Sequence, residues 1–137
     1  VVTPALEAIC EATVYMSGVG ADNVNCAAAH SFYNGLTSLG GHSAPHGNCV
    51  AFGTLVQLVL EGVPQEEFDE VQDFCLEVGL PTTLEEVGIT TDEQIKKIAE
   101  AACVPGETIH NLAGDVTPDE LYAAIVQADA MGRALKA

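Results

Sequence analysis

The chain has 137 residues, of which 20 are acidic and four are Lys or Arg, so its formal net charge at pH 7 is -16. A charge of this sign and size repels nucleic-acid phosphates and anionic lipid headgroups, and we expect neither as a partner. Nor do we expect a membrane partner, because no apolar run approaches the length of a membrane span. The five cysteines are widely spaced and form no C-x-x-C pair, which favours a reduced, cytoplasmic protein.

The first half of the chain predicts three helices. A Thr-Pro pair is typical of a helix start, and apolar residues recur at helical spacing from there to Gly18. Asn25 is placed to cap a second, Ala-rich helix over residues 26–39, which a glycine pair ends. Residues 50–60 are apolar nearly all round, as expected of a helix that is buried on most sides.

The second half predicts further helices with recognisable starts. Pro64 opens a helix that Gly79 ends, with an acidic outer face and one apolar stripe, formed by Phe68, Val71, Phe74, Cys75 and Val78. Capping boxes, in which a threonine precedes Glu or Gln by three residues, begin at Thr83, Thr91 and Thr117. The segment 104–115 is expected to be a loop, and no segment of strand length alternates at period two. We therefore predict one all-α domain over residues 1–137, a compact bundle of six to seven helices.

Three of the four histidines lie on either side of the glycine-rich turn that separates the second predicted helix from the third. His30 falls on the second helix and His46 begins the third, so a tight turn would bring both imidazoles to one point. Two neutral imidazoles suit zinc, but a catalytic zinc site normally has three protein ligands. Short histidine spacings are common by chance. Spacing alone therefore favours polar residues around a loop over metal ligands.

Other polar residues near these histidines have more than one interpretation. Asn34 lies four residues after His30, on the same helical face, so it points towards whatever His30 binds or is a solvent-facing or loop-capping amide. His42 is a possible third ligand, although an exposed position is favoured. His110, in the predicted loop, is best explained by a structural hydrogen bond. No dinucleotide fingerprint, P-loop or nucleophile elbow is present in the sequence.

Five stretches of the sequence resemble a known family. They are "VVTPALEAI", "AAAHSFYNGLTSL", "HGNCVAFGTLVQLVLEG", "VGLPTTLEEVGI" and "AEAACVPGETIHNLAGDVTPDELYAAIVQAD". In order and spacing they resemble the C-terminal helical domain of bacterial NAD-dependent glycerol dehydrogenases, which belong to the iron-containing alcohol dehydrogenase superfamily. The resemblance covers essentially the whole chain and implies a dehydroquinate synthase-like helical domain. The N-terminal nucleotide-binding α/β domain of that family would lie upstream of Val1.

The resemblance also implies roles for four residues. In that family one aspartate and two histidines hold a divalent metal, usually zinc, and the matching stretches place His30 and His46 at the two histidines. The aspartate would lie upstream of Val1. Asn34 stands where iron-dependent relatives carry a further histidine, and near Ala21 family members can carry a bulkier residue that faces the substrate. We therefore expect Asn34 and Ala21 on the substrate side, and no catalytic residue beyond the two metal ligands.

The function implied is the C-terminal part of an enzyme that oxidises glycerol, or a small polyol, to dihydroxyacetone with NAD. The metal would lower the pKa of a substrate hydroxyl, while NAD would bind the other domain of the full-length relative. The isolated chain is expected to be inactive and to bind zinc weakly. An alternative is a non-catalytic acidic helical module, derived from that family, that acts by association. In both cases we expect an uncovered apolar face and a homo-oligomer.

Overall fold

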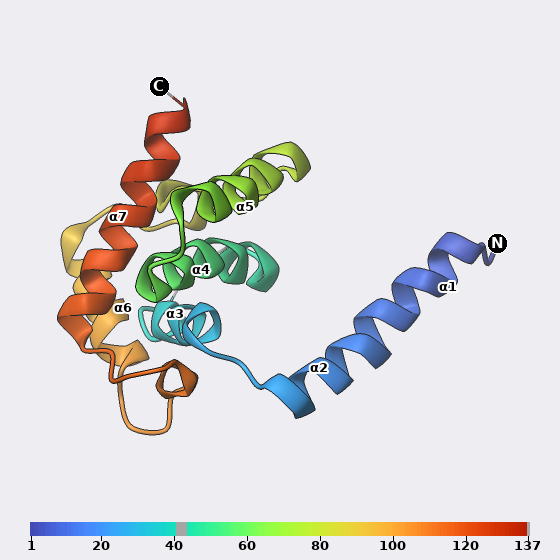
Figure 1. Cartoon of the computed structure of the whole chain (residues 1–137), viewed down its shortest axis with the longest axis horizontal. Helices are drawn as coiled ribbons and strands as arrows, with labels where there is room; N and C mark the ends of the chain where they lie inside the picture. The colour runs from blue at the N-terminus through green and yellow to red at the C-terminus, as the bar shows by residue number, and fades with distance from the viewer. Residues whose placement is uncertain (41–43, 137) are drawn as a thin grey trace.

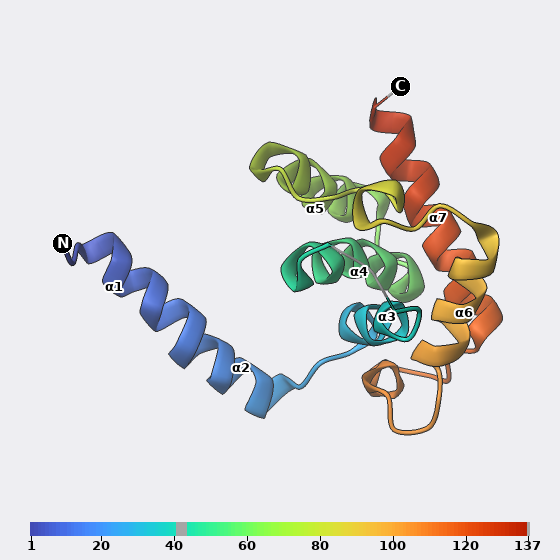
Figure 2. The ribbon, with the colours of Figure 1, turned by 180° about the vertical axis from the view of Figure 1, so that it is seen from behind.

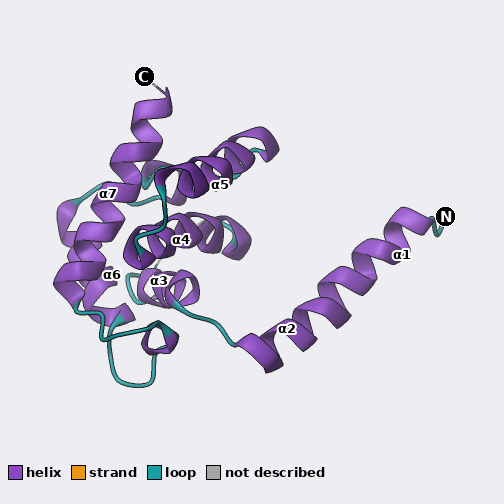
Figure 3. Ribbon diagram, viewed as in Figure 1, coloured by secondary structure: helices purple, strands orange, loops and turns teal. Residues whose placement is uncertain are grey.

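The computed structural model describes residues 1–40 and 44–136, and within them every regular element is a helix (Figure 3). The longer elements of the folded body are α3 (Ala28–Thr37), α4 (His46–Glu61), α5 (Gln65–Val78), α6 (Asp92–Ala102) and α7 (Pro118–Lys136). Two 3₁₀ turns, η2 (Glu85–Val87) and η3 (Thr108–Asn111), complete it. The predicted all-α fold is confirmed, whereas His42 lies outside the described residues.

The N-terminal segment forms one rod that extends away from the body (Figure 1). It joins α1 (Pro4–Cys10), a π-helical stretch η1 (Glu11–Met16) and α2 (Ser17–Val24), and none of its residues is buried. The predicted helix end at Gly18 is wrong, because a glycine inside a helix costs only about 1 kcal/mol and does not end it alone. The rod ends instead at Asn25, whose backbone has φ 64°.

Asn25 is therefore a helix end and not the cap of the following helix, which corrects the prediction for this residue. Its side chain accepts a hydrogen bond from the backbone of Cys26, just outside the helix. A backbone N–H group in the first turn of α3 finds its hydrogen-bond acceptor in another helix: that of Ala29 donates to Gln57 Oε1 of α4 at 3.2 Å. A long-range partner of this kind leaves no local sequence signal.

The body is built around α4, as the stretch that is apolar nearly all round predicts. In both views α3, α4 and α5 lie in successive layers, while α6 and α7 run across their ends (Figure 2). Helices α3 and α4 approach closely: a Cβ added at Gly53 would lie 2.6 Å from the carbonyl oxygen of Ala29. Beside this crossing the rings of Phe32 and Phe52 pack with their centroids 5.5 Å apart, and both side chains are fully buried.

The helix boundaries predicted in the second half agree well with the structure. Helix α5 follows Pro64 and ends at Gly79, which has φ 76°. Its predicted apolar stripe is only half covered: Phe68 and Cys75 are buried, but Phe74 remains 57% exposed. The physical reason is that α5 packs mainly against α4, which covers a single side of it. The predicted loop 104–115 contains the short turn η3.

Capping boxes form at two of the three predicted places. At the start of α6, Gln94 Oε1 accepts from the backbone of Thr91, whose hydroxyl accepts from the backbone of Gln94. Thr117 and Glu120 form the same arrangement before α7. At the third place, the backbone and hydroxyl of Thr83 both donate to Glu86, but among the described residues the hydroxyl accepts no backbone hydrogen bond and does not cap η2. In the described part of the chain no helix has both the length and the apolar character that a membrane crossing requires.

Candidate metal centre

His30 lies in the first turn of α3, and polar contacts hold this turn from two sides. On one side, the buried hydroxyl of Ser31 accepts a hydrogen bond of 2.7 Å from the backbone N–H of Ile109 in η3. On the other, Gln57 of α4 accepts from the backbone of Ala29. The backbone that carries His30 is therefore fixed between η3 and α4.

His46 is the first residue of α4 and is exposed. Pro45 precedes it with φ -58° and ψ 147°, which is an extended backbone that turns into the helix at His46. The imidazole of His46 lies between two side chains of α3. Its ring centroid is 5.6 Å from that of His30, with the planes inclined by 54°, and 4.5 Å from that of Tyr33, with the planes at 90°.

The spacing of the two imidazoles fits a shared metal ion. With a zinc–nitrogen distance of about 2.1 Å, a ring centroid lies about 3.2 Å from the metal, and tetrahedral geometry puts two such centroids about 5.2 Å apart. The observed 5.6 Å between His30 and His46 is close to that value. Two histidines supply half of a four-coordinate site. Among residues 1–40 and 44–136, no group of three or more His, Cys, Asp or Glu side chains is arranged to hold a metal.

The electrostatic environment of His30 suits a metal ligand. Burial, and next the neighbouring His46, lower the pKa of His30 below its ordinary value of 6.5. A lowered pKa keeps the imidazole neutral at pH 7, and the neutral ring has the free nitrogen lone pair that a metal requires.

The remaining residues singled out from the sequence are placed differently. Asn34 is exposed, and its Nδ2 donates to Glu107 Oε2 at 2.9 Å. Ala21 is exposed on α2, a helix that contacts chiefly the neighbouring part of the rod. The predicted structural role of His110 is confirmed, because its Nε2 lies 3.2 Å from the carbonyl oxygen of Val104.

Sequence reasoning missed Tyr33. This residue is partly buried, packs against the hydrophobic core and contacts the imidazole of His46 with its ring. A signal was available, because Tyr33 follows His30 by three residues and side chains at that spacing share a helix face. The prediction considered only polar residues near the histidines and therefore omitted this aromatic residue.

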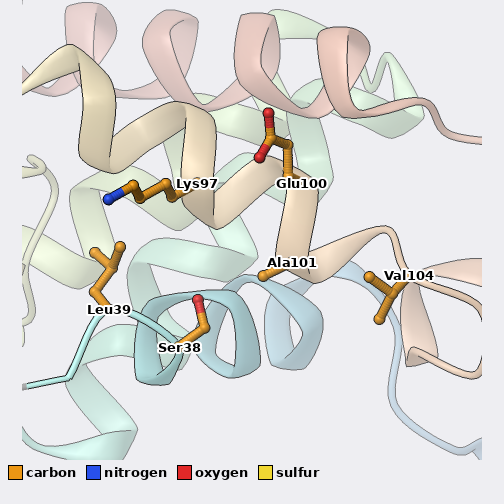
Figure 4. Close-up of a pocket in the computed structure, with 6 residues that line it drawn as sticks. All are labelled: Ser38, Leu39, Lys97, Glu100, Ala101 and Val104. Carbon is orange, nitrogen blue, oxygen red and sulfur yellow. The ribbon is translucent and has the colours of Figure 1, made fainter.

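A hollow of about 410 Å³ borders His30 but not His46. It lies between the end of α2, the start of α3, the second half of α4 and the end of η3 with the residues that follow it, and its polar lining includes Gln57, Glu61 and Asn111. Its volume is in the range of small-molecule sites. A second hollow, of about 390 Å³, lies between the end of α3 and α6, and neither His30 nor His46 lines it. Lys97 and Glu100 are among its lining residues on α6 (Figure 4).

Comparison with known proteins gives consistent results over nearly the whole chain. The chain is 50% identical over 136 residues to a glycerol dehydrogenase of Pseudomonas putida, and 52% identical over 136 residues to one of Escherichia coli O6:H1; each match covers 97% of this chain. The crystal structure of glycerol dehydrogenase from Schizosaccharomyces pombe matches 98% of the chain with 41% identity and a TM-score of 0.89, and 36% of that structure is covered. The chain spans 37% of the length of the two bacterial relatives. No family model matches the sequence.

Proposed function

Because this chain belongs to the glycerol dehydrogenase family, as part of its C-terminal region, we propose that residues 1–137 form the helical metal-binding domain of such an enzyme. In this proposal His30 and His46 are two of the ligands of a catalytic zinc. The observation that carries it is the pairing of the two imidazoles, with centroids 5.6 Å apart, across the crossing of α3 and α4. The proposal includes a cytoplasmic location, which rests on five free cysteines.

When bound, the metal supplies Lewis acidity, which lowers the pKa of a hydroxyl of glycerol or a small polyol. The residues of this chain hold the metal ligands in position. His30 is held by the contacts of Ser31 and Ala29 with η3 and α4, and it offers a neutral nitrogen. Asn34 and Ala21 are proposed on the substrate side. The amide of Asn34 is engaged by Glu107 and would need to leave it to meet a substrate.

NAD binding and hydride transfer are assigned to the part of the relatives that these 137 residues do not cover. The polypeptide of residues 1–137 is therefore expected neither to oxidise glycerol with NAD nor to bind NAD. Steady-state assays by NADH absorbance, on protein whose mass has been verified and which is free of host enzyme, test this. Turnover by the purified chain would refute the assignment.

Zinc titration by calorimetry tests the ligand assignment. We expect weak one-to-one binding to the wild type, because two imidazoles lack the further ligand and the negative charge of a complete catalytic site. The variants His30→Ala and His46→Ala should each lose this binding. His110→Ala is the matched control, since His110 makes its hydrogen bond elsewhere. Binding that survives both of the first two substitutions would place the metal at other residues.

A second candidate function is association without catalysis, and the rod favours it. Large apolar side chains are exposed along its length, among them Ile9 (62%), Val14 (76%), Tyr15 (66%) and Met16 (64%). Exposed apolar surface of this kind finds a partner, whereas the net charge of -16 opposes self-association most strongly at low salt. We expect a homo-oligomer whose population rises with salt. Sedimentation across a salt series tests this expectation, and a monomer at every ionic strength would exclude the homo-oligomer.

A further inference from the structure

We propose that Tyr33 is a positioning residue for the metal centre: its ring holds the imidazole of His46 in the orientation that faces His30. This inference rests on the function proposed above, because it assigns Tyr33 a role in a site that His30 and His46 form. The direct observation is the contact of the two rings, which meet at 90° with centroids 4.5 Å apart. Perpendicular packing at this distance is a preferred arrangement of aromatic side chains.

The position of His46 explains why support is needed. It is exposed at the first residue of α4, and Pro45, the residue before it, makes no side-chain hydrogen bond that caps the helix. A histidine that binds a metal usually donates its second ring N–H to a carboxylate or carbonyl, which fixes the ring. Among the described residues the ring of His46 meets only His30 and Tyr33 and makes no hydrogen bond. Packing against the ring of Tyr33 orients the imidazole of His46.

Tyr33 is well placed to give this support because it is itself anchored. Its backbone lies within α3, and its side chain is partly buried and packs against the core. His30 and Tyr33 are three residues apart, so their side chains leave α3 on the same face. A single helical turn thus supplies both one ligand and the ring that orients the other. The relative position of the two imidazoles then depends on one rigid segment.

His30 does not provide this orientation by itself. The planes of His30 and His46 are inclined by 54° with centroids 5.6 Å apart, which is a looser contact than that of Tyr33. If Tyr33 were absent, His46 would keep its place in α4, but its side chain would lose the closest ring contact that it makes within residues 1–40 and 44–136. We expect the main loss to be in the population of the paired orientation, with the fold retained.

The test compares three variants by NMR without metal and by zinc calorimetry. Tyr33→Leu removes the aromatic ring, Tyr33→Phe keeps it, and Tyr15→Leu removes an exposed tyrosine of the rod as a matched control. In the wild type we expect nuclear Overhauser effects between the rings of Tyr33 and His46. In Tyr33→Leu the ring proton resonances of His46 should shift, whereas those of His110 should not. Tyr33→Phe and the control should preserve the wild-type shifts of His46.

For zinc we expect a loss of affinity of about tenfold in Tyr33→Leu, the lower end of the range for residues that support a ligand. Tyr33→Phe should restore wild-type affinity. Wild-type affinity in folded Tyr33→Leu, or a loss in Tyr33→Phe equal to that in Tyr33→Leu, would overturn the role of the ring. If Tyr33→Leu does not fold, the wild-type Overhauser effects and Tyr33→Phe still decide the question.

The two proposals fail in distinguishable ways. Absence of zinc binding in the wild type, together with intact Overhauser effects between Tyr33 and His46, would refute the metal site and would leave Tyr33 with no ligand to position. Zinc binding that needs both histidines but is insensitive to Tyr33→Leu would refute the inference alone. Absence of the Overhauser effects in the metal-free wild type would refute the packing of the two rings directly.

Discussion

The substitution Gly53→Ala should destabilise the chain through the crossing of α3 and α4. An added Cβ would lie 2.6 Å from the carbonyl oxygen of Ala29 and 3.0 Å from its Cα, and both atoms belong to the backbone of α3. Neither atom can move away as the end of a flexible side chain can. The helices must therefore separate at the place where α4 approaches the turn that carries His30.

The size of the effect follows from two opposing terms. Forcing an extra carbon into a packed interior costs about 1 to 3 kcal/mol. Replacing glycine by alanine inside a helix returns about 1 kcal/mol. We expect a net decrease of about 1 kcal/mol in the free energy of unfolding, which corresponds to about 4 °C in Tm for a domain of this size.

Thermal and urea denaturation, followed by far-ultraviolet circular dichroism, measure this difference. Gly47→Ala is the matched control, because Gly47 lies in the same helix and a Cβ there would meet nothing within 4 Å. It should leave Tm unchanged or raise it. If Gly53→Ala were as stable as Gly47→Ala, the close packing of α3 on α4 would be refuted, and with it the support for the arrangement of His30 and His46.

Two further predictions concern local anchors. Burial alone would raise the pKa of Glu86, but hydrogen bonds from Lys136, Thr82 and Thr83 lower it from 4.5 to about 2. Its stabilising contribution is therefore complete above about pH 4.5 and is lost as the pH falls towards 2. Because the Glu86 side chain is 40% exposed, screening by solvent limits the effect, and Glu86→Gln should lower the free energy of unfolding by about 1 kcal/mol at pH 7. Urea titrations at pH 7 and pH 3 should show that the difference in stability between Glu86→Gln and wild type is smaller at pH 3. An equal difference at both pH values would contradict the assignment. Thr91→Ala should lower the free energy of unfolding by about 1 kcal/mol, because it removes the hydroxyl that caps α6. The control variant Thr90→Ala should be nearly neutral. Equal melting temperatures of the two variants would refute the cap.

The sequence predicts best what local chemistry decides. The capping box at Thr91 and the helix end at Gly79 involve residues a few positions apart, so their geometry follows from the pattern alone. The helix that runs past Gly18 was mispredicted because a single glycine is a weak stop signal. The exposure of Phe74 was not predictable from periodicity, because it depends on how much of α5 the neighbouring helix covers.

In the candidate site, too, local features were predictable from the sequence and long-range contacts were not. The pairing of His30 with His46 follows from two helices joined by a short turn, and the structure brings the two rings together. The contacts that fix His30 come from Gln57 and η3, which are remote in sequence and give no local signal. Tyr33 had a local signal in its spacing from His30, but its contact with His46 depends on the angle at which α4 begins.

The most direct test of the metal centre is anomalous X-ray diffraction at the zinc edge on crystals of the chain grown with zinc. We predict an anomalous peak between His30 and His46, about 2.1 Å from one imidazole nitrogen of each residue. A peak coordinated by only one of these histidines, or zinc bound at other residues with none between the two rings, would contradict the assignment of this helical domain as the metal-binding part of a glycerol dehydrogenase.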